Sequence, residues 1–347
     1  MVIPELMHGV VLTGSGGPDR LEWRDDLAVP EPQDGDVLIR VGASAVNNTD
    51  INMRTGWYSE DASWSGEPVT FPRIQGADVC GRIVAVGPGV EQSRVGERVL
   101  VEPCIREADG HGLQSAWYLG SDCDGGFAEY TRVASRHAHR VASPLSDVEL
   151  ASFPCSYSTA ENMLTRSDAG QGETVLVTGA SGGVGSAAVQ LLKTRGARVV
   201  AVTSPEKAET MRELGADLTI DRDADYVGEL GRGNVDVVVD LVAGHQWHLL
   251  LDVLRPGGRY VVAGAIGGAL VELDVRKLYL KDLSFFGCTV LDTGVFGRLV
   301  ESVERGDVRP LISEIYPLRR LAEAQAAFQE KGHVGKIVIA VNPENGL

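Results

Sequence analysis

The chain has 347 residues, of which 44% are hydrophobic, and a chain of this length and composition is expected to form about two domains with substantial cores. Its formal net charge is −16, which excludes the extended basic surface that nucleic acids and anionic membranes require. Its five cysteines are scattered and odd in number, a pattern that suits a reducing compartment better than a disulfide framework.

No targeting segment is recognisable in the sequence. Residues 1–14 lack the basic and apolar regions of a secretion signal. A run of ~18 uninterrupted apolar residues is also absent, so no membrane span is expected. We therefore expect a cytoplasmic protein.

Residues 1–150 are rich in predicted strands. Short apolar or alternating runs are separated by Gly, Pro and Asp, which predicts a compact barrel-like domain. These runs are Gly9–Thr13, Asp36–Val46, Val79–Val86, Arg98–Glu102 and Phe127–Val133. Residues 103–126 carry no clear pattern and are predicted to be a long loop, which is uncommon unless the loop is functional.

From Ser146 onward, strands and helices alternate, which is typical of a doubly wound parallel sheet. The predicted strands are Thr174–Thr178, Arg198–Thr203, Leu218–Asp221, Val235–Val242, Gly258–Gly264 and Leu283–Val290. The predicted helices between them are Pro205–Leu214, Gln246–Leu254 and Gly294–Glu304. The tail Ile312–Val341 has a strand, the helix Leu318–Glu330 and the strand Lys336–Val341, and we expect it to return to the first domain.

A glycine-rich turn follows the strand Thr174–Thr178. Small residues let the backbone pass close to a pyrophosphate, and the helix that begins near Gly183 points its free N–H groups at the phosphates. Ala180 stands in place of the first glycine of the GxGxxG pattern. The alternative is an ordinary strand, turn and helix without a ligand. The predicted cofactor-binding residues of the turn are Gly179, Ala180, Ser181, Gly182, Gly183 and Val184.

Several motifs occur in the order of a known family. They are Asn47–Asp50 with Arg54–Tyr58, Pro72–Asp78 followed by Gly81 and Val86-Gly87, Gly125–Tyr130, the glycine-rich turn and Gly335–Val338. In these motifs the chain resembles the medium-chain dehydrogenase/reductase superfamily, and within it the zinc-independent quinone oxidoreductase-like branch.

The resemblance implies an α/β fold in which a Rossmann doubly wound parallel sheet, residues 151–291, is inserted into a GroES-like β-rich catalytic domain, residues 1–150 and 292–347. It also implies an active site between the two domains, and hydride transfer with a nicotinamide cofactor.

The resemblance also identifies the positions where zinc-dependent relatives bind their catalytic metal. These positions are Asn47, Ala77 and Cys155. Alanine has no ligand atom, and one thiolate cannot build a site that needs three protein ligands. The cysteines of a structural zinc lobe are also missing. Cys104 and Cys123 with His111 and Asp122 form an alternative metal cluster, or else an ordinary loop; we expect no metal.

Three residues are predicted to contact the substrate. Asn47 is placed to donate an amide hydrogen to the substrate oxygen, or else it caps a loop. Tyr58 lines the pocket or donates its hydroxyl, or else it is a packed aromatic residue. Glu161 follows Thr159 where relatives have an aromatic residue. It relays a proton if it faces the cleft; otherwise it lies in the first turn of a helix, stabilised by the dipole.

The end of the second parallel strand indicates which nicotinamide cofactor binds. NAD-dependent relatives have Asp there, whereas this chain has Thr203, followed by Ser204 and Lys207. Arg222 follows the third strand. Two cations and two hydroxyls suit the 2′-phosphate of NADPH. The alternative is that Ser204 only caps its helix and Lys207 is a surface charge, with NADH as the cofactor.

Further cofactor contacts are implied by the resemblance alone. They are Thr159, Gly264, Ala265, Ile266, Cys288 and Val290. The apolar run Leu283–Val290 is implied to be an edge strand. Left exposed, such an edge would invite aggregation. The resemblance implies that it pairs with its twin across a two-fold axis, so we expect a homodimer formed through this strand.

The leading hypothesis is therefore an NADPH-dependent oxidoreductase that reduces a small quinone or α,β-unsaturated carbonyl compound without zinc. The second is an alcohol or aldehyde dehydrogenase of the same superfamily. The third, of another class, is a sensor or structural protein that binds NADPH without turnover. None of these hypotheses involves a nucleic acid or a membrane.

Overall fold

The chain folds into two units. The computed structural model describes residues 2–57, 70–106 and 116–342. The strand-rich unit comprises residues 1–155 and 310–347, and the parallel-sheet unit comprises residues 156–309. The expected domains divided instead at 150/151 and 291/292. The difference arises chiefly because the helix Val295–Arg305 belongs to the parallel-sheet unit.

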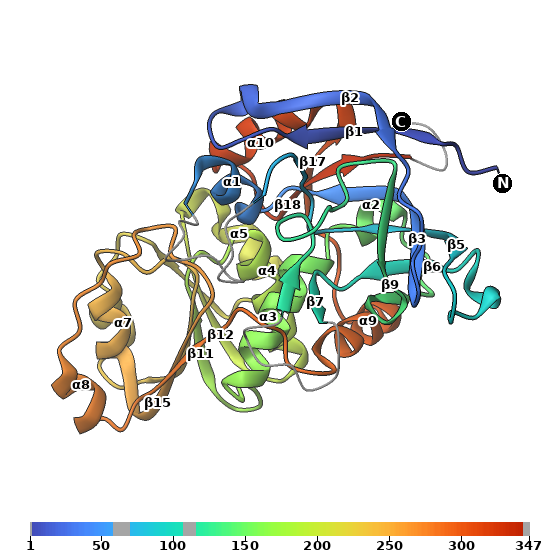
Figure 1. The fold of residues 1–347 in the computed structure, drawn as a ribbon. Coiled ribbons are helices and arrows are strands. Elements are labelled where there is room, and N and C mark those ends of the chain that lie inside the picture. Colours follow the sequence, from blue (N-terminus) through green and yellow to red (C-terminus); the bar gives the residue numbers. More distant parts are fainter. Residues whose placement is uncertain (1, 58–69, 107–115, 343–347) are drawn as a thin grey trace. The chain divides into compact units, whose positions relative to one another are not determined.

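The strand-rich unit is built around one large sheet (Figure 1). Its strand order is β10-β6-β5-β3-β18-β17, and β9 also pairs with β3. The bounds are β3 Asp36–Ala45, β5 Cys80–Val86, β6 Arg98–Val101, β9 Tyr130–Ala134, β10 Ala138–Arg140, β17 Ile312–Pro317 and β18 Lys336–Ala340. The smaller sheets contain β1 Leu6–Leu12, β2 Leu21–Ala28 and β4 Arg73–Ile74, and β7 Cys104–Arg106 with β8 Ala116–Tyr118.

The carboxyl-terminal segment completes the large sheet. Strand β18 runs antiparallel to β3, with Val338 opposite Ala45. Every residue of β18 is buried, including Lys336. Its apolar side chains join those of β1 and helix α10 in one core cluster. The tail therefore returns to the first part of the chain, in agreement with the expectation from the sequence.

Few helices lie in the strand-rich unit. They are α1 Asn48–Thr55, α2 Asp147–Leu150 and α10 Leu321–Gln329, with the 3₁₀ turns η1 Pro18–Arg20, η2 Gln92–Arg94, η4 Ser135–His137 and η6 Leu318–Arg320. A second core cluster is formed largely by side chains of β3, β5 and β6. It includes Ile39, Val41 and Val99, which are all fully buried.

The parallel-sheet unit has a six-stranded parallel sheet in the order β13-β12-β11-β14-β15-β16. The strands are β11 Thr174–Val177, β12 Arg198–Thr203, β13 Leu218–Asp221, β14 Val235–Asp240, β15 Leu254–Val262 and β16 Ser284–Gly287. The strand order reverses between β11 and β14. Ligands of such sheets bind at this point, beyond the carboxyl ends of the strands.

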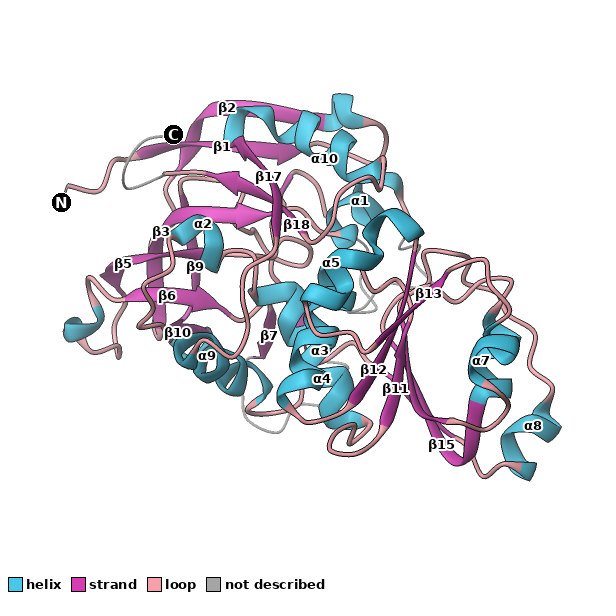
Figure 2. Cartoon of the chain, turned by 180° about the vertical axis from the view of Figure 1, so that it is seen from behind, coloured by secondary structure: helices cyan, strands magenta, loops and turns pink. Residues whose placement is uncertain are grey.

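Helices cover both faces of the parallel sheet (Figure 2). They are α4 Gly183–Thr194, α5 Ala208–Glu213, α6 Tyr226–Leu230, α7 Trp247–Val253, α8 Val275–Leu280 and α9 Val295–Arg305, with the 3₁₀ turn η5 Pro205–Lys207. Helix α3, Pro154–Arg166, begins in the strand-rich unit. Because both faces are covered, the central strands are continuous apolar runs; Val175 to Val177 and Val237 to Val239 are fully buried.

The structure differs from the sequence prediction in several segments. Strand β2 and helices α6 and α8 were not predicted. Residues 103–126 contain β7 and β8, in which Cys104 lies opposite Tyr118. Strands of three residues are too short for a period-two pattern to stand out. Strand β15 begins at Leu254 rather than Gly258, because its pairing with β14 shifts register before Arg259.

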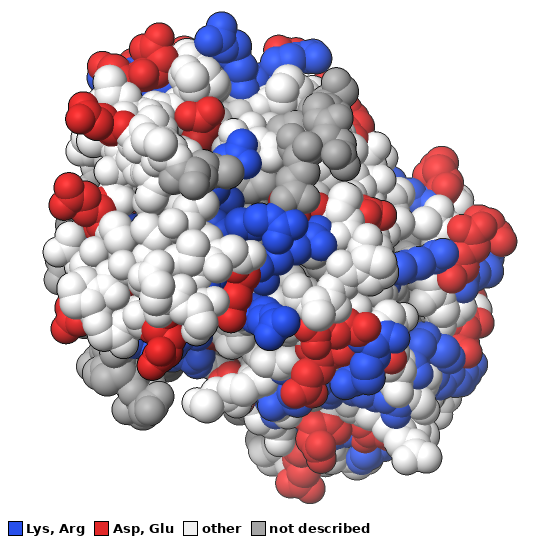
Figure 3. Space-filling model, turned by 90° about the vertical axis from the view of Figure 1, so that its right-hand side faces the viewer, with Lys and Arg blue, Asp and Glu red and all other residues white. Residues whose placement is uncertain are grey.

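The negative net charge is not spread evenly over the surface. On the face shown in Figure 3, a compact group of Lys and Arg side chains lies near the centre, and acidic side chains are interspersed around it. Within the part of the chain that the structure describes, no helix is both long and apolar enough to cross a membrane.

Candidate active site

The glycine-rich turn between β11 and α4 has the geometry that a phosphate-binding turn requires. Gly179 has a φ of +57°, in the left-handed region. A Cβ at Gly185 would lie 2.3 Å from the Gly179 carbonyl oxygen, so only glycine lets α4 pack against the turn. Helix α4 begins after Gly182 with no acidic residue in its first turn. Its free N–H groups therefore suit an anion.

The residues predicted to bind a 2′-phosphate gather at the carboxyl end of β12. The Thr203 hydroxyl is buried and has no hydrogen-bond partner among the described residues. Burial, and then the neighbouring Arg222 charge, lower the pKa of Lys207. The two cations are thus close enough to repel each other. Glu206 interacts with both cations and with the Ser204 hydroxyl, and Asp223 Oδ2 lies 3.6 Å from Arg222 Nε. Both carboxylates oppose a phosphate here.

A buried carboxylate that the sequence analysis missed organises the centre of this sheet edge. Asp240 accepts hydrogen bonds from the Thr178 hydroxyl at 2.5 Å and the Tyr260 hydroxyl at 2.6 Å. Its Oδ1 also accepts from the N–H groups of Val242 and Ala243. It therefore holds the carboxyl ends of β11 and β14 together, at the point where the strand order reverses. An aspartate that ends the apolar run of β14 was the available signal.

The other predicted cofactor residues of the parallel-sheet unit lie at or near the same edge. Gly264, Ala265 and Ile266 follow β15. Cys288 follows β16 and its N–H donates to the Val262 carbonyl, while burial raises the pKa of its thiol to about 11. The Val290 carbonyl accepts a hydrogen bond from Asn162 Nδ2 at 3.0 Å. Ser181 precedes helix α4, Val184 is its second residue, and Thr159 lies on α3.

Both explanations offered for Glu161 need correction. The residue lies in the third turn of α3, not in the first, because the helix begins at Pro154. Its carboxylate is 2.7 Å from Arg195 Nη2 and 3.2 Å from Arg298 Nε. Each oxygen is paired with an arginine, and the side chain is buried. This arrangement makes Glu161 a structural ion-pair partner within the parallel-sheet unit and leaves neither oxygen for a proton relay.

Asn47 caps helix α1 and is held by three hydrogen bonds through its side chain. Its Nδ2 donates to Asp78 Oδ2 at 2.8 Å and to the Ala45 carbonyl at 3.2 Å. Its Oδ1 accepts from Lys336 Nζ at 2.6 Å. The capping alternative therefore agrees with the structure. The predicted contact with a substrate remains a prediction, in which the substrate oxygen would replace one of these acceptors.

The partner of Asn47 is a buried ion pair that the sequence analysis did not predict. Lys336 Nζ lies 2.8 Å from Asp78 Oδ2, and both side chains are almost inaccessible to solvent. Asp78 Oδ1 accepts from the N–H of Cys155, in the first turn of α3, at 2.6 Å. Removing one partner of a buried pair costs about 3–5 kcal/mol. The signal was a lysine that opens the apolar strand Lys336–Ala340.

A second buried network fixes the other end of α1. Arg54 is almost fully buried, and its Nε donates to Gln325 Oε1 at 2.8 Å. Its Nη1 and Nη2 donate to the Gly16 carbonyl and to Gln329 Oε1, both at 3.0 Å. Gln325 continues the network to Gln75. Helix α1 is therefore tied to α10 by donors and acceptors that leave no room for alternative positions of Asn47.

Burial dominates the titration of the groups around the ion pair. It raises the pKa of Asp50 to about 7, although the N–H groups of Asn47 and Gly76 donate to its oxygens at 2.8 and 3.2 Å. Burial likewise raises the pKa of the Cys155 thiol to about 12, and the Asp78 charge adds to this.

At the three positions where zinc-dependent relatives have metal ligands, this chain has the amide of Asn47, the methyl group of Ala77 and the thiol of Cys155. In the described ranges, no three His, Cys, Asp or Glu side chains come together in a way that could hold a metal ion. His111, which the sequence analysis grouped with Cys104, Cys123 and Asp122, lies outside the described residues, as does Tyr58. The predictions for His111 and Tyr58 remain predictions.

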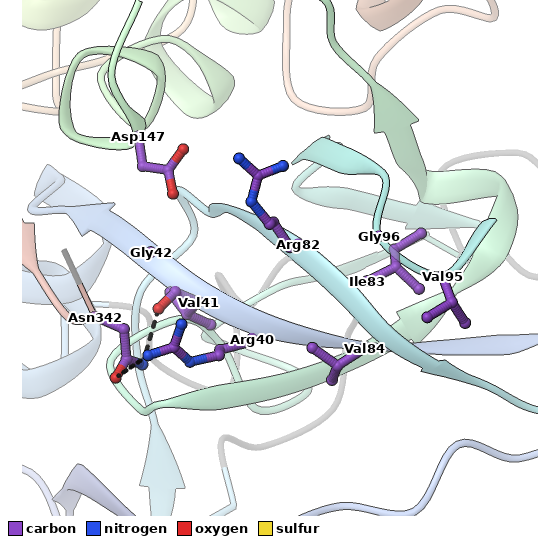
Figure 4. Close-up of a pocket in the computed structure, with 10 residues that line it drawn as sticks. All are labelled: Arg40, Val41, Gly42, Arg82, Ile83, Val84, Val95, Gly96, Asp147 and Asn342. Atoms are coloured by element: carbon purple, nitrogen blue, oxygen red, sulfur yellow. Dashed lines mark hydrogen bonds between the residues drawn. The ribbon is translucent and has the colours of Figure 1, made fainter. Parts of the chain in front are cut away.

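A pocket of about 210 Å³ lies elsewhere in the strand-rich unit (Figure 4). Arg40 of β3 faces Arg82 of β5 across the sheet, and Arg40 bonds Asn342. The pocket contains none of the residues predicted to bind substrate or cofactor. The lining residues are Arg40, Val41, Gly42, Arg82, Ile83, Val84, Val95, Gly96, Asp147 and Asn342.

Two family models match the chain. The model described as the alcohol dehydrogenase GroES-like domain matches residues 33–143, and the model described as a zinc-binding dehydrogenase matches residues 183–305. Human quinone oxidoreductase is 30% identical over 355 residues, covering 96% of this chain and 98% of its own. The chain belongs to the medium-chain dehydrogenase/reductase superfamily.

Other members of the superfamily differ in their named activities. The NAD-dependent alcohol dehydrogenase of Sulfolobus acidocaldarius is 30% identical, covering 96% of this chain and all of its own. The chloroplastic NADPH-dependent alkenal/one oxidoreductase of Arabidopsis thaliana is 30% identical, covering 97% and 80%. A solved structure from Sinorhizobium meliloti 1021, provisionally named an alcohol dehydrogenase, is 45% identical with a TM-score of 0.93, covering 98% of both chains.

The chain is thus an oxidoreductase of the medium-chain superfamily, with a GroES-like domain and a Rossmann-like parallel sheet. Members of the superfamily bind NAD or NADP. The residues present fit such a dinucleotide: the glycine turn lets the backbone pass close to a pyrophosphate, and the buried Thr203 hydroxyl has no partner in the part of the chain that the structure describes.

The raised pKa of Asp50 predicts a specific pH dependence of stability. Because its pKa is about 7 in the folded protein against 3.8 ordinarily, the fold loses stability as the pH rises through this interval. The free energy of unfolding of the wild type should therefore fall more steeply between about pH 4 and pH 7 than that of Asp50→Asn. Chemical denaturation at several pH values measures both, with the exposed Asp34→Asn as control. Parallel profiles for wild type and D50N would contradict the raised pKa.

Proposed function

We propose that the protein is an NADPH-dependent oxidoreductase that reduces quinones or α,β-unsaturated carbonyl compounds without zinc. The observation that carries the proposal is the replacement of the metal-ligand positions. Asn47 is bonded to a lysine ammonium, and Ala77 has no ligand atom. Alcohol oxidation by zinc-dependent relatives relies on a Lewis acid, whereas in a conjugated acceptor the charge that develops on reduction is delocalised.

The chain's own residues would hold the cofactor and orient the substrate. The first turn of α4 binds the pyrophosphate, and Lys207 and Arg222 pair with the 2′-phosphate. Thr203 donates its hydroxyl to the same end of the nucleotide. When bound, the reduced nicotinamide supplies the hydride. The Asn47 amide stands at a position where zinc-dependent relatives bind their metal, and it would stabilise the developing negative charge on the substrate oxygen.

Two relatives support this proposal and others favour an alternative. Human quinone oxidoreductase and the Arabidopsis alkenal/one oxidoreductase carry names that agree with it. The 45% identical structure from Sinorhizobium meliloti favours an alcohol dehydrogenase. A protein that binds NADPH without turnover is the third alternative. The free cysteines of the described chain agree with a reducing cytoplasm.

An acceptor screen tests the function directly. Purified protein that has been treated with a chelator should consume NADPH with small quinones or enones, and zinc addition should change the rate less than about twofold, because no step needs a Lewis acid. Primary alcohols with NADP should give no turnover. Zinc-dependent alcohol oxidation would favour the dehydrogenase, and NADPH binding without any turnover would favour the sensor.

Cofactor choice can be tested at the carboxyl end of β12. Lys207→Ala and Arg222→Ala should each lower kcat/KM for NADPH by on the order of 10-fold or more, since a charge-assisted hydrogen bond contributes about 1.5–3 kcal/mol. The kcat/KM for NADH should change less than about twofold. Arg198→Ala, at the opposite end of the same strand, is the matched control. A wild type that prefers NADH would overturn the assignment.

We also propose a homodimer formed through β16. This strand ends the parallel sheet, and several exposed apolar side chains lie near it in the sequence. They are Ile266, Leu270, Val275, Tyr279, Leu280 and Phe285. An edge strand with apolar neighbours suits pairing with a second copy.

Light scattering at micromolar concentration should therefore give the mass of a dimer. Lysine on an edge strand opposes pairing, so Ser284→Lys on β16, combined with Leu280→Lys at the exposed end of α8, should shift the mass toward that of a monomer. Leu6→Lys, an exposed leucine of the strand-rich unit, should leave the mass unchanged. A monomeric wild type would contradict the proposal.

A further inference from the structure

The ammonium of Lys336 helps to fix which way the Asn47 amide points. An ammonium group only donates hydrogen bonds, so the Asn47 oxygen faces Lys336 Nζ, at 2.6 Å. The amide nitrogen faces the opposite way, toward Asp78 and the Ala45 carbonyl. These two groups only accept, so they favour the same direction. Lys336 is the cation among the three groups that orient the Asn47 donors.

The same contact strengthens those donors. An amide whose oxygen accepts from a cation is polarised, and its N–H groups become stronger donors. The effect is large here because Lys336 and Asp78 are buried, where charges are poorly screened. Of the two Asn47 donor bonds, the one to Ala45 is longer, at 3.2 Å against 2.8 Å. It is the weaker bond and the easier one for a developing oxyanion to replace.

We propose that Lys336 is a positioning residue for the reduction: its ammonium orients and polarises the Asn47 amide, which stabilises the negative charge that develops on the substrate oxygen. Lys336 thereby provides a positive charge that acts on the substrate oxygen through the Asn47 amide, whereas the metal ion of zinc-dependent relatives acts on it directly. The inference rests on the proposed function. Asp78 balances the charge of Lys336, so the pair supplies direction and polarisation without a net charge.

A purely structural role of the ion pair must be distinguished from this one. Lys336→Met alone leaves the Asp78 carboxylate buried and unpaired, which destabilises the fold. The double variant Lys336→Met with Asp78→Asn removes both charges and retains an oxygen to accept from the Cys155 N–H. Its amide nitrogen then replaces the oxygen that accepts from Asn47 Nδ2, so the Asn47 amide loses the groups on both sides that orient it. Lys331→Met is a matched control, because Lys331 Nζ bonds Asn48 Oδ1 at 2.9 Å, one residue from Asn47. Thermal unfolding and the Kd for NADPH show whether each variant is folded.

The readout is the dependence of kcat on the electron demand of the acceptor. In K336M/D78N, kcat should fall on the order of 10- to 100-fold for weakly electrophilic enones, which need the donor most. It should fall only a few-fold for strongly electron-poor quinones. The Kd for NADPH should stay within about twofold, and Lys336→Arg should recover part of the rate, because its guanidinium also donates. K331M should behave as wild type for every acceptor.

Several results would overturn the inference. One is a folded K336M/D78N that retains the wild-type kcat, and another is an equal loss for all acceptors, which indicates a general structural defect. The ¹⁵N–¹H signal of the Asn47 side-chain amide provides a readout without turnover, and polarisation predicts a shift of this signal in K336M/D78N. A wild type that reduces no acceptor defeats the proposed function. An unchanged amide signal in the variant defeats this inference alone.

Discussion

The buried ion pair between Lys336 and Asp78 is the interaction on which the candidate site depends. It joins the last strand of the chain to the segment after β4, and it reaches α1 through Asn47 and α3 through the Cys155 N–H. Two charges removed from water are stable only when nearly all their hydrogen-bonding capacity is used. Strand β18, the segment after β4, and helices α1 and α3 are therefore connected by one hydrogen-bonded network. This network explains how residues so distant in sequence keep one geometry.

The parallel-sheet unit uses a buried carboxylate in a similar way. Asp240 accepts from two hydroxyls and from two backbone N–H groups at the point where the strand order reverses. These bonds connect the loops that follow β11 and β14 to one carboxylate. In each unit a buried carboxylate accepts several hydrogen bonds, Asp78 in the strand-rich unit and Asp240 in the parallel-sheet unit. Each carboxylate thereby positions backbone that is expected to lie near the substrate or the cofactor. The glycine turn and the cations near β12 are arranged around this rigid edge.

The sequence was sufficient for the alternation of strands and helices in the parallel-sheet unit, the glycine turn and the return of the tail, because these depend on local periodicity and on turn residues. It was insufficient wherever a role depends on partners far away. Glu161 was assigned to a cleft or to a helix dipole, and its arginine partner Arg298 lies 137 residues later. Lys336 and Asp78 are 258 residues apart. Pairing between polar side chains has no period, so only the folded chain reveals it.

The bond between Lys336 and Asn47 also limits how this chain could change over generations. Reintroducing a cysteine at position 47, the first step toward a zinc site, would remove the oxygen that accepts from the ammonium. The buried lysine would then lack one of its two described acceptors, at a cost of about 1–3 kcal/mol, before any metal could bind. A cysteine at position 47 would therefore be tolerated best together with a substitution of Lys336 and Asp78, the two charges that the amide joins.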